Sequence, residues 1–332
     1  MPRVFVGKTD GDLAYRMREG LDWINWKEAI PSGARVFIKP NLTFPFHKPG
    51  VTTSPEVIDL LVSILKERTP NITIGESDGG SNSWTAEEAF RGHHLPEIAQ
   101  RHQVSLVNLS RSSTEEVTLP LRGGALTLEL PTLLLRETDV FITVPVPKIH
   151  AMTRVSLGLK NQWGCIPAGE HRYRYHHVFD EMVCHLNRLF KTKLVVGDCT
   201  WMLTGNGPLF GEELRRDLIV VADDLGSFEL TMLHLMGIQG WTVGHLSEAQ
   251  GMGMAPVTLD GITFNRDWGE FRGDPFTLKR TLQNYVALAG FNSRFLTWFL
   301  YDSPLAGLIH VGLYAVKGNP IKEAIEEKEG AE

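Results

Sequence analysis

Residues 140–146 read VFITVPV, a continuous apolar run as long as one strand, and Pro147 and Lys148 follow it directly. A run without polar alternation is typical of a strand that is covered on both faces, as in the parallel sheets of α/β proteins. Comparable short runs recur along most of the chain. They are RVFIK (35–39), NITIGESD (71–78), SLVNL (105–109), LVVGD (194–198) and LIVVAD (218–223).

Helical patterns lie between these runs. Ser54 and Pro55 have the residue types that begin a helix, and apolar residues follow at helical spacing. The alternation of strands and helices predicts an α/β fold, with a mainly parallel sheet and helices on both faces. The segment 114–130 alternates as in a hairpin and indicates an insertion. The predicted helices are 54–68, 85–103 with a break near Leu95-Pro96, 178–190 and 225–237.

The composition changes after about residue 240, where glycine and methionine cluster in GHLSEAQGMGMAP (244–256). We therefore expect an α/β domain over 1–240 that carries the site, and a smaller, helical C-terminal region over 241–332 that packs on it or extends it.

The segment 296–316, LTWFLYDSPLAGLIHVGLYAV, is long and apolar, but Asp302, Pro304 and His310 interrupt it. An ionised aspartate is costly in a lipid core, so two buried helices broken at Asp302 to Pro304 are expected here. A membrane contact and a homodimer surface are the alternatives.

Bulk properties exclude several classes of protein. The net charge of −6 provides no general field for nucleic acid. The three cysteines contain no C-x-x-C pair, so an iron–sulfur cluster is not expected. The N-terminus lacks the apolar core of a secretory signal, and a reducing, cytoplasmic location is expected. No G-x-G-x-x-G or Walker A sequence indicates a nucleotide enzyme.

Polar residues gather where the predicted strands end. In open α/β sheets ligands bind beyond the carboxyl ends of the strands, so these residues are candidates for one site. Each also has an ordinary explanation as a surface charge, a helix cap or a turn. The candidates are, strand by strand, Lys39, Asn41 and Thr53; Glu76 and Asp78; Lys148, His150, Lys160 and Asn161; and Asp198, Asn206 and Gly207.

The densest segment runs from Lys148 to His177 and mixes cations and histidines with apolar anchors. Cations around a cavity hold carboxylates or phosphates, and imidazoles move protons or bind metals. We assign predicted roles by residue type. Lys148, His150, Lys160 and His177 are the catalytic candidates; Lys39, Asn41, Thr53, Asn161, Asn206 and Gly207 would bind substrate; Glu76, Asp78, His176 and Asp198 would hold a divalent metal.

Several motifs together resemble the domain of unknown function 362 family over about residues 35–240. They are IKPNLTFP, TTSPEVI, GESDGG, VPKIHAMTRVSLGLKNQWGCIP, RYRYHH and GDCTWMLTGNGPLFGE, of which LKN-x-x-G and GNGP are the most specific. The resemblance implies no reaction. Some members carry ferredoxin-like modules, which this chain lacks, and Asp198-Cys199 stands where the family has Asp-Gly.

The spacing His150-x9-Lys160-x15-His176 is similar to that of the lactate racemase catalytic domain. The resemblance implies that His150 is an acid/base, that Lys160 anchors a nickel-pincer cofactor or binds substrate, and that His176 ligates the metal. This chain departs from the pattern twice. Leu157-Gly158-Leu159 precedes Lys160 in place of three glycines, and Glu76-Ser77-Asp78 stands where a second catalytic histidine is expected, so the nickel-pincer cofactor itself is not expected.

Two hypotheses follow. The first is an enzyme that moves a proton on a small carboxylated or phosphorylated metabolite, as an isomerase, epimerase or lyase, with or without a metal. The second is a non-catalytic protein that binds an anion or metal and serves a partner enzyme, docking through its apolar C-terminal region.

Overall fold

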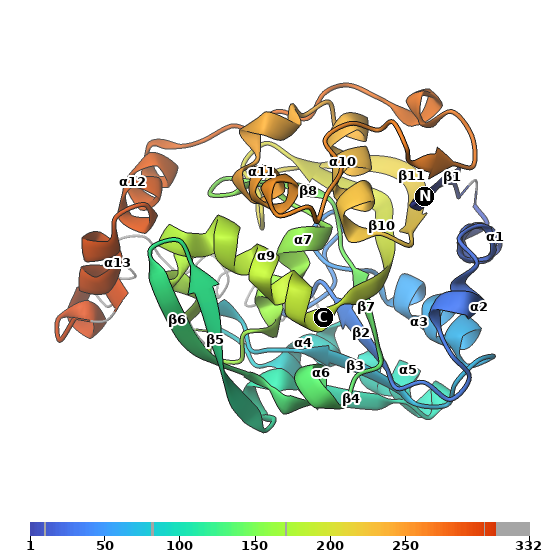
Figure 1. Ribbon diagram of the computed structural model, residues 1–332, viewed down its shortest axis with the longest axis horizontal. Helices are drawn as coiled ribbons and strands as arrows, with labels where there is room; N and C mark the ends of the chain where they lie inside the picture. Colours follow the sequence, from blue (N-terminus) through green and yellow to red (C-terminus); the bar gives the residue numbers. More distant parts are fainter. Residues whose placement is uncertain (10, 81–82, 170, 302, 310–332) are drawn as a thin grey trace, which may run out of the picture.

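The computed structural model describes residues 1–9, 11–80, 83–169, 171–301 and 303–309. Ten strands in these residues form one mixed sheet, in the order β12-β1-β11-β10-β7-β2-β3-β4, with β8 and β9 attached beside β10 (Figure 1). The strands are β1 Arg3–Lys8, β2 Val36–Pro40, β3 Ile72–Glu76, β4 Ser105–Asn108, β7 Val140–Val144, β8 Lys148–His150, β9 Arg154–Ser156, β10 Thr192–Thr204, β11 Glu212–Ala222 and β12 Thr263–Phe264.

The apolar run at 140–146 forms the central strand β7, in which all five residues are buried. It pairs in parallel with β2 on one side and β10 on the other, and β2, β3 and β4 continue the parallel part. The predicted α/β fold with a mainly parallel sheet is confirmed.

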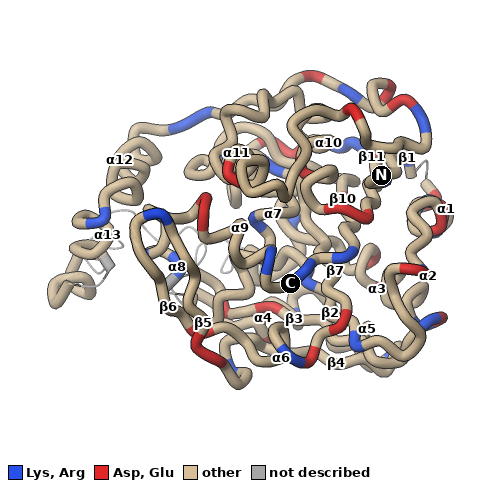
Figure 2. The backbone as a smooth tube through the Cα atoms, viewed as in Figure 1, with Lys and Arg blue, Asp and Glu red and all other residues tan. Residues whose placement is uncertain are grey.

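Successive residues of a strand point to opposite sides of the sheet, so the buried apolar side chains on each face need a cover. Helices provide that cover on both faces. Phe141 faces a core that contains the later helices, whereas Ile142 faces a core built with the early ones. In Figure 1, α1, α2 and α3 lie on the right, whereas α9 and α11 lie left of centre and α10 lies above; α8, labelled in Figure 2, lies on the left. The early group is α1 Leu13–Trp23, α2 Trp26–Ala29, α3 Pro55–Leu65, α4 Ala86–Gly92 and α5 Leu95–His102; the later group is α6 Thr132–Arg136, α7 Gly158–Asn161, α8 His171–Arg174, α9 Phe179–Phe190, α10 Leu225–Leu235 and α11 Gly244–Gly251.

The hairpin expected at 114–130 forms as β5 Thr114–Leu121 and β6 Gly124–Pro131. It makes a separate two-stranded sheet, and Leu119, Leu128 and Leu130 anchor it in the core. The hairpin is therefore an insertion on the face that carries the later helices.

Strands β10 and β11 differ from expectation. They extend well beyond 194–198 and 218–223 and pair antiparallel, with only Gly205 to Gly211 between them. Asp198 therefore lies in the middle of a strand instead of at its end. Strand β1 also pairs antiparallel with β11, so the sheet is mixed at this edge.

The C-terminal region contains helices, as predicted, namely α12 Leu282–Phe291 and α13 Arg294–Tyr301. The expectation that 296–316 is buried is wrong for its described part, because Trp298 is 49% exposed and Leu308 73% exposed. Residues 310–316 lie outside the described part. None of the helices in the described ranges is both long and apolar enough to cross a bilayer. The boundary near residue 240 stays a prediction, and β12 joins the sheet beside β1.

Candidate functional site

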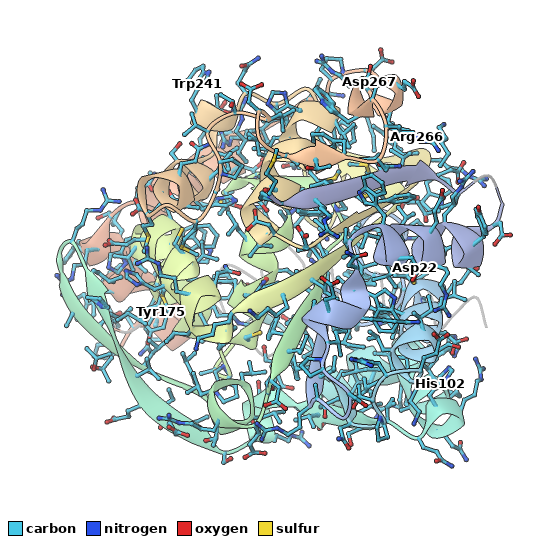
Figure 3. All side chains as sticks on the ribbon, turned by 45° about the vertical axis from the view of Figure 1, so that its right-hand side comes forward. Asp22, His102, Tyr175, Trp241, Arg266 and Asp267 are labelled. Atoms are coloured by element: carbon cyan, nitrogen blue, oxygen red, sulfur yellow. The ribbon has the colours of Figure 1, made fainter. Side chains whose placement is uncertain are left out.

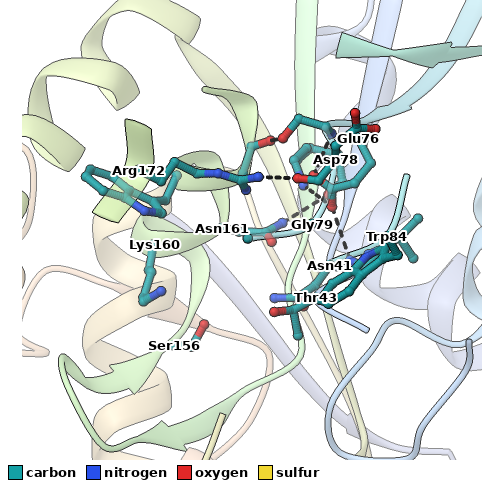
Figure 4. Close-up of a pocket in the computed structure, with 16 residues that line it drawn as sticks. Asn41, Thr43, Glu76, Asp78, Gly79, Trp84, Ser156, Lys160, Asn161 and Arg172 are labelled. Atoms are coloured by element: carbon teal, nitrogen blue, oxygen red, sulfur yellow. Dashed lines mark hydrogen bonds and ion pairs between the residues drawn. The ribbon is translucent and has the colours of Figure 1, made fainter. Parts of the chain in front are cut away.

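A cavity of about 100 Å³ lies at the carboxyl ends of β2 and β3, against α7. Its wall includes Lys39, Glu76, Lys160, Asn161 and Arg172, which come from distant parts of the sequence. Figure 4 shows the segment with Lys160 and Asn161 on one side and the loop after β2 on the other. Of the strand ends predicted to converge, those of β2 and β3 meet here with the segment of Lys160 and Asn161. The other strand-end candidates do not line the cavity, namely Thr53, Lys148, His150, Asp198, Asn206 and Gly207. The chemical roles of these residues remain predictions.

Lys39 and Glu76 form a buried ion pair across the cavity floor. The Lys39 ammonium donates to Glu76 Oε2 at 2.6 Å and to the Pro40 carbonyl at 2.7 Å, and the two side chains are 1% and 7% exposed. Glu76 also accepts the backbone N–H of Leu42 at 3.2 Å. Lys39 therefore has its charge balanced within the protein.

Gly164 explains the glycine in LKN-x-x-G. A Cβ at this position would lie 2.9 Å from Glu76 Oε1 and 3.2 Å from Lys39 Nζ. Only a residue without a side chain lets the backbone approach the ion pair this closely. The motif thus packs its backbone directly over the buried charges.

Three predicted binding residues hold the strand ends together. Thr53 accepts the N–H of Asn41 at 2.8 Å and donates to the carbonyl of Val144 at 2.8 Å. Asn161 donates to the Lys39 carbonyl at 3.0 Å and to Thr143 Oγ1 at 2.8 Å. Asn41 and Asn161 also line the cavity, so they rigidify its wall, whereas Thr53 acts from behind it.

Lys148 is completely buried behind the cavity. Its ammonium donates to the carbonyl of Val51 and, at 3.3 Å, to Asn41 Oδ1. Burial holds the pKa of Lys148 well below its ordinary value, and the nearby charges of Lys160 and Lys39 lower that pKa further. Lys148 therefore supports the site from behind, through its contact with Asn41, without lining the cavity.

The β8–β9 ribbon presents a polar and an apolar face. Lys148 pairs with Ser156 and His150 pairs with Arg154, while Ile149 and Val155 between them are buried in the core. His150 Nδ1 accepts the backbone N–H groups of Met152 and Thr153 at 3.1 and 3.3 Å. Burial lowers the pKa of His150 well below its ordinary value, so the imidazole is neutral and carries its proton on Nε2.

Lys160 has fewer polar contacts than the other cations that line this cavity. The structure gives its ammonium no hydrogen-bond partner among the residues it describes, and Nζ lies 5.5 Å from the centre of the Phe179 ring. Burial lowers the pKa of Lys160 to about 8, with a smaller contribution from the charge of Arg172. Near neutral pH both protonation states of this amine are accessible.

Arg172 completes the basic wall and was not among the predicted site residues. Its guanidinium donates to the carbonyl of Asp78, and Figure 4 shows this contact above Lys160. Burial lowers the pKa of Arg172, but a guanidinium stays charged. The signal in the sequence was the HRYR run at 171–174, in which position alone does not tell which cation turns inward.

The predicted metal ligands do not form one group. No cluster of three or more metal-ligating side chains occurs in the part of the chain that the structure describes. Asp78 lines the cavity, but its Oδ1 accepts from Ala86 N and Asn108 Nδ2, both at 2.8 Å. Asp198 accepts the N–H of Ser54 at 2.8 Å from its position within β10. The prediction that Glu76, Asp78, His176 and Asp198 form one metal site is therefore wrong for these positions.

The two neighbouring histidines lie outside the cavity wall. His176 Nδ1 donates to the Arg172 carbonyl at 2.9 Å, and burial lowers the pKa of His176 to about 4. His177 Nδ1 donates to the Arg174 carbonyl at 2.9 Å and lines a separate surface groove. His177 is therefore not brought to Lys160 as the predicted catalytic set required.

Asn206 and Gly207 support the ribbon from the loop after β10. Gly207 accepts the N–H of Ala151 at 2.9 Å, and a Cβ on Gly207 would lie 1.9 Å from the carbonyl oxygen of Ile149. The glycine of the GNGP motif thus allows the loop to touch β8. Neither residue lines the cavity.

A buried acid–histidine pair behind Lys160 was missed by the sequence reasoning. Glu229 accepts the N–H of Leu159 at 2.9 Å and lies 3.3 Å from His245 Nε2, and both side chains are fully buried. His245 Nδ1 lies 3.7 Å from Asp180. Burial alone would lower the pKa of His245, but Asp180 and Glu229 together raise it. This pair fixes the peptide next to Lys160.

Chemical acylation gives a direct test of the Lys160 environment. With acetic anhydride, the acylation rate of Lys160 should rise with a midpoint near pH 8, because this pKa is lowered by burial. Nα-acetyl-lysine amide in the same solution is the control, and its acylation rate should keep rising toward about pH 10.4. Mass spectrometry over a pH series measures both. Equal midpoints for Lys160 and this control would contradict the lowered pKa.

Comparisons with known proteins show what this chain is similar to. A thylakoid-associated protein of Synechocystis sp. is 24% identical over 247 residues, covering 71% of this chain and 73% of the relative. The lactate racemase apoprotein from Thermoanaerobacterium thermosaccharolyticum gives a TM-score of 0.39 at 17% identity, covering 59% of this chain and 50% of that one. A Thermotoga maritima protein gives a TM-score of 0.41 at 14% identity, covering 75% and 61%. The chain thus spans about half the length of the lactate racemase chain.

Residues 36–234 match the family described as Domain of unknown function (DUF362), which confirms the resemblance seen in the motifs. Since the match covers more than half of the sequence, the chain belongs to the DUF362 family.

Proposed function

We propose that this chain is an enzyme that moves a proton on a small carboxylated or phosphorylated metabolite, as an isomerase, epimerase or lyase. The observation that carries the proposal is the Lys160 ammonium. It faces a shielded cavity beside Arg172, has a pKa of about 8, and has no hydrogen-bond partner of its own in the described residues. We further propose that the protein acts on this metabolite in the cytoplasm.

The balance of charge favours an anionic ligand. The charge of Lys39 is met by Glu76, and Lys148 is tied to a carbonyl and an amide oxygen. Lys160 and Arg172 remain without a carboxylate partner in the described part of the structure. Carboxylate and phosphate oxygens are the usual partners of such cations, and a cavity shielded from water strengthens the attraction.

The same geometry suits proton transfer. A general acid or base works best when its pKa lies near the working pH, and Lys160 meets that condition. The neutral His150, with Nδ1 occupied by two backbone N–H groups, has only a donor to offer. We assign Lys160 as the acid/base, Arg172 as the anion clamp, and His150 as a donor that stabilises negative charge developing on an oxygen.

Replacement of Lys160 with methionine should weaken orthophosphate binding at least tenfold, because one charge-assisted hydrogen bond is lost. Isothermal titration of both proteins measures this effect. Replacement of the exposed Lys193 with methionine is the matched control and should leave binding unchanged.

Turnover is tested by incubating the protein in D2O with a panel of 2-hydroxy, 2-oxo and phosphorylated acids. The expected result is loss of the NMR signal of the proton next to the acidifying carbonyl or carboxylate, on carbon 2 of a 2-hydroxy acid or on carbon 3 of a 2-oxo acid. This loss should occur with the natural chain and be absent with the Lys160→Met variant. Orthophosphate binding without exchange on any panel member would favour the second hypothesis, a non-catalytic binding protein.

The second hypothesis has one specific observation in its favour. Helices α12 and α13 expose large apolar side chains, among them Leu282, Phe295 and Trp298, which are 80%, 67% and 49% exposed. Such a cluster is typical of a surface that contacts a partner. A binding-only protein would bind orthophosphate but would show no solvent exchange with any member of the panel.

A further inference from the structure

A second cavity, of about 250 Å³, lies beside the first. Its wall includes Arg154, His176, Phe179, Arg280 and Phe291. Phe179 belongs to the boundary between the two cavities, because the Lys160 ammonium lies 5.5 Å from the centre of its ring and the ring of Trp163, in the first cavity, lies 4.8 Å away. Phe179 therefore lines the second cavity and also lies close to Lys160.

The β8–β9 ribbon connects the two cavities. Ser156 lines the first and Arg154 lines the second, and they stand two residues apart on β9. Their partners across the ribbon are Lys148 and His150. Residues two apart on a strand are separated by about 6.6 Å, so a ligand of a few atoms can reach along this polar row.

Arg154 has two features that ordinary packing does not explain. Its φ of +69° lies in the left-handed region, which residues other than glycine and asparagine rarely adopt. Its Nε is buried with no hydrogen-bond partner among the residues that the structure describes. A strained backbone together with a buried, unsatisfied N–H group is found at positions that contact a ligand.

Arg280 adds a second, oriented cation. Its Nε donates to the Ala151 carbonyl at 2.7 Å, within the turn that follows His150. The acid in this wall, Asp180, lies 3.7 Å from His245 Nδ1, and Asp180 and Glu229 raise the pKa of this imidazole. The cavity thus holds two guanidiniums, the groups best suited to grip a carboxylate or phosphate with two hydrogen bonds.

We propose that this cavity binds a second anionic group of the substrate, which is therefore a small metabolite with two anionic ends, a dicarboxylate or a phosphorylated carboxylate. One end lies at Lys160 and Arg172 and the other at Arg154 and Arg280, with the reacting carbon between them near His150. This inference rests on the proposed function, because it takes the first cavity as the site of the first anion.

The test compares dicarboxylates from malonate to adipate with acetate and propionate, using isothermal titration. The natural chain should bind one dicarboxylate length at least tenfold more tightly than the monocarboxylates. Arg154→Asn should remove that preference and leave the monocarboxylate affinity unchanged. Asparagine tolerates the left-handed backbone, so the melting temperature should not fall. Arg280→Gln, which leaves the strained residue in place, should also remove the preference.

The outcomes separate this inference from the proposed function. If Lys160→Met abolishes monocarboxylate binding but Arg154→Asn and Arg280→Gln both retain the dicarboxylate preference, the second subsite is refuted and the first stands. If the natural chain has no dicarboxylate preference, the second subsite is likewise refuted. If it binds none of these anions, both proposals fail.

Discussion

Replacement of Glu76 with glutamine is expected to lower the free energy of unfolding by about 3–5 kcal/mol, one of the two largest effects that we predict. The Lys39–Glu76 pair is almost completely buried, with side chains that are 1% and 7% exposed. Glutamine keeps a neutral oxygen near the Lys39 ammonium, which also donates to the Pro40 carbonyl at 2.7 Å, but it removes the negative charge that balances this buried cation. An uncompensated charge in such a place is far more costly than a lost surface contact.

The same strand offers a matched control at its other end. Arg35, just before β2, pairs with Asp139 at 2.7 Å, but these side chains are 49% and 44% exposed. Water screens that pair, so Asp139→Asn should change the unfolding midpoint far less than Glu76→Gln. Urea denaturation followed by circular dichroism compares the variants. A similar loss for both would show that burial of the Lys39–Glu76 pair is not what makes it costly to break.

A double replacement tests whether the unbalanced charge of Lys39 causes the loss of stability. Lys39→Met combined with Glu76→Leu takes away both charges and should recover much of the lost stability, because a buried ion pair is often replaceable by apolar residues. The double variant should nevertheless bind orthophosphate differently from the natural chain, because both residues line the cavity.

The parallel part of the fold could be predicted because its strands are short, apolar and separated by capped helices. Ser54 accepts the N–H of Val57 as the cap of α3, and the break expected near Leu95 separates α4 from α5. These features are local, so the sequence alone reveals them.

The antiparallel pairing of β10 with β11 was not predicted, although the sequence contains a physical indication of it. Parallel neighbours need a crossover of a dozen or more residues, usually a helix, whereas β10 and β11 are joined by only Gly205 to Gly211. Their outer halves are CTWMLT (199–204), which the predicted strand did not include, and EELRRD (212–217), which is mostly charged and does not look like a buried strand. Recognition of the short glycine-rich connection would have placed Asp198 within a strand.

The candidate site was predictable where strand ends and the dense polar segment supply it. Lys39 and Glu76 meet because parallel strands end at one edge of the sheet, whereas Asn161 joins them from α7. Arg172 and the Glu229–His245 pair come from helices, and which side of a helix faces the cavity depends on long-range packing. Helical spacing marks the apolar face of α9, but α10 is apolar nearly all round, so nothing local singles out Glu229.

Replacement of Glu229 with leucine is the other large effect that we predict, a loss of about 3–5 kcal/mol in the free energy of unfolding. Glu229 holds the Leu159 N–H at 2.9 Å and faces His245 at 3.3 Å, with both side chains fully buried. Leucine would leave the N–H without an acceptor and His245 without its closest acid. Glutamine keeps an acceptor for the N–H, so Glu229→Gln should cost clearly less.

The difference between natural chain and Glu229→Gln should depend on pH in a definite direction. The pKa of His245 in the folded protein lies above its ordinary value near 6.5, as Asp180 and Glu229 outweigh the opposing effect of burial. The stability that a raised histidine pKa contributes is fully present at pH values below the ordinary pKa. It is lost as the pH rises through the pKa of the folded state. His150, whose own pKa is lowered in part by His245, and the buried Cys184, which contacts the His245 carbonyl at 3.5 Å, are the other titratable groups here.

Glu229→Gln should therefore destabilise the protein more at pH 6 than at pH 9, as measured by urea unfolding at both values. The exposed pair of Lys279 and Glu212, 2.5 Å apart, provides the control, because Glu212→Gln should have a small effect at either pH. The acylation midpoint of Lys160 gives a second measurement, since Glu229 fixes the peptide next to it. A loss of stability that is the same at both pH values would mean that His245 carries no charge in the folded protein, and that Glu229 acts only as the acceptor for Leu159.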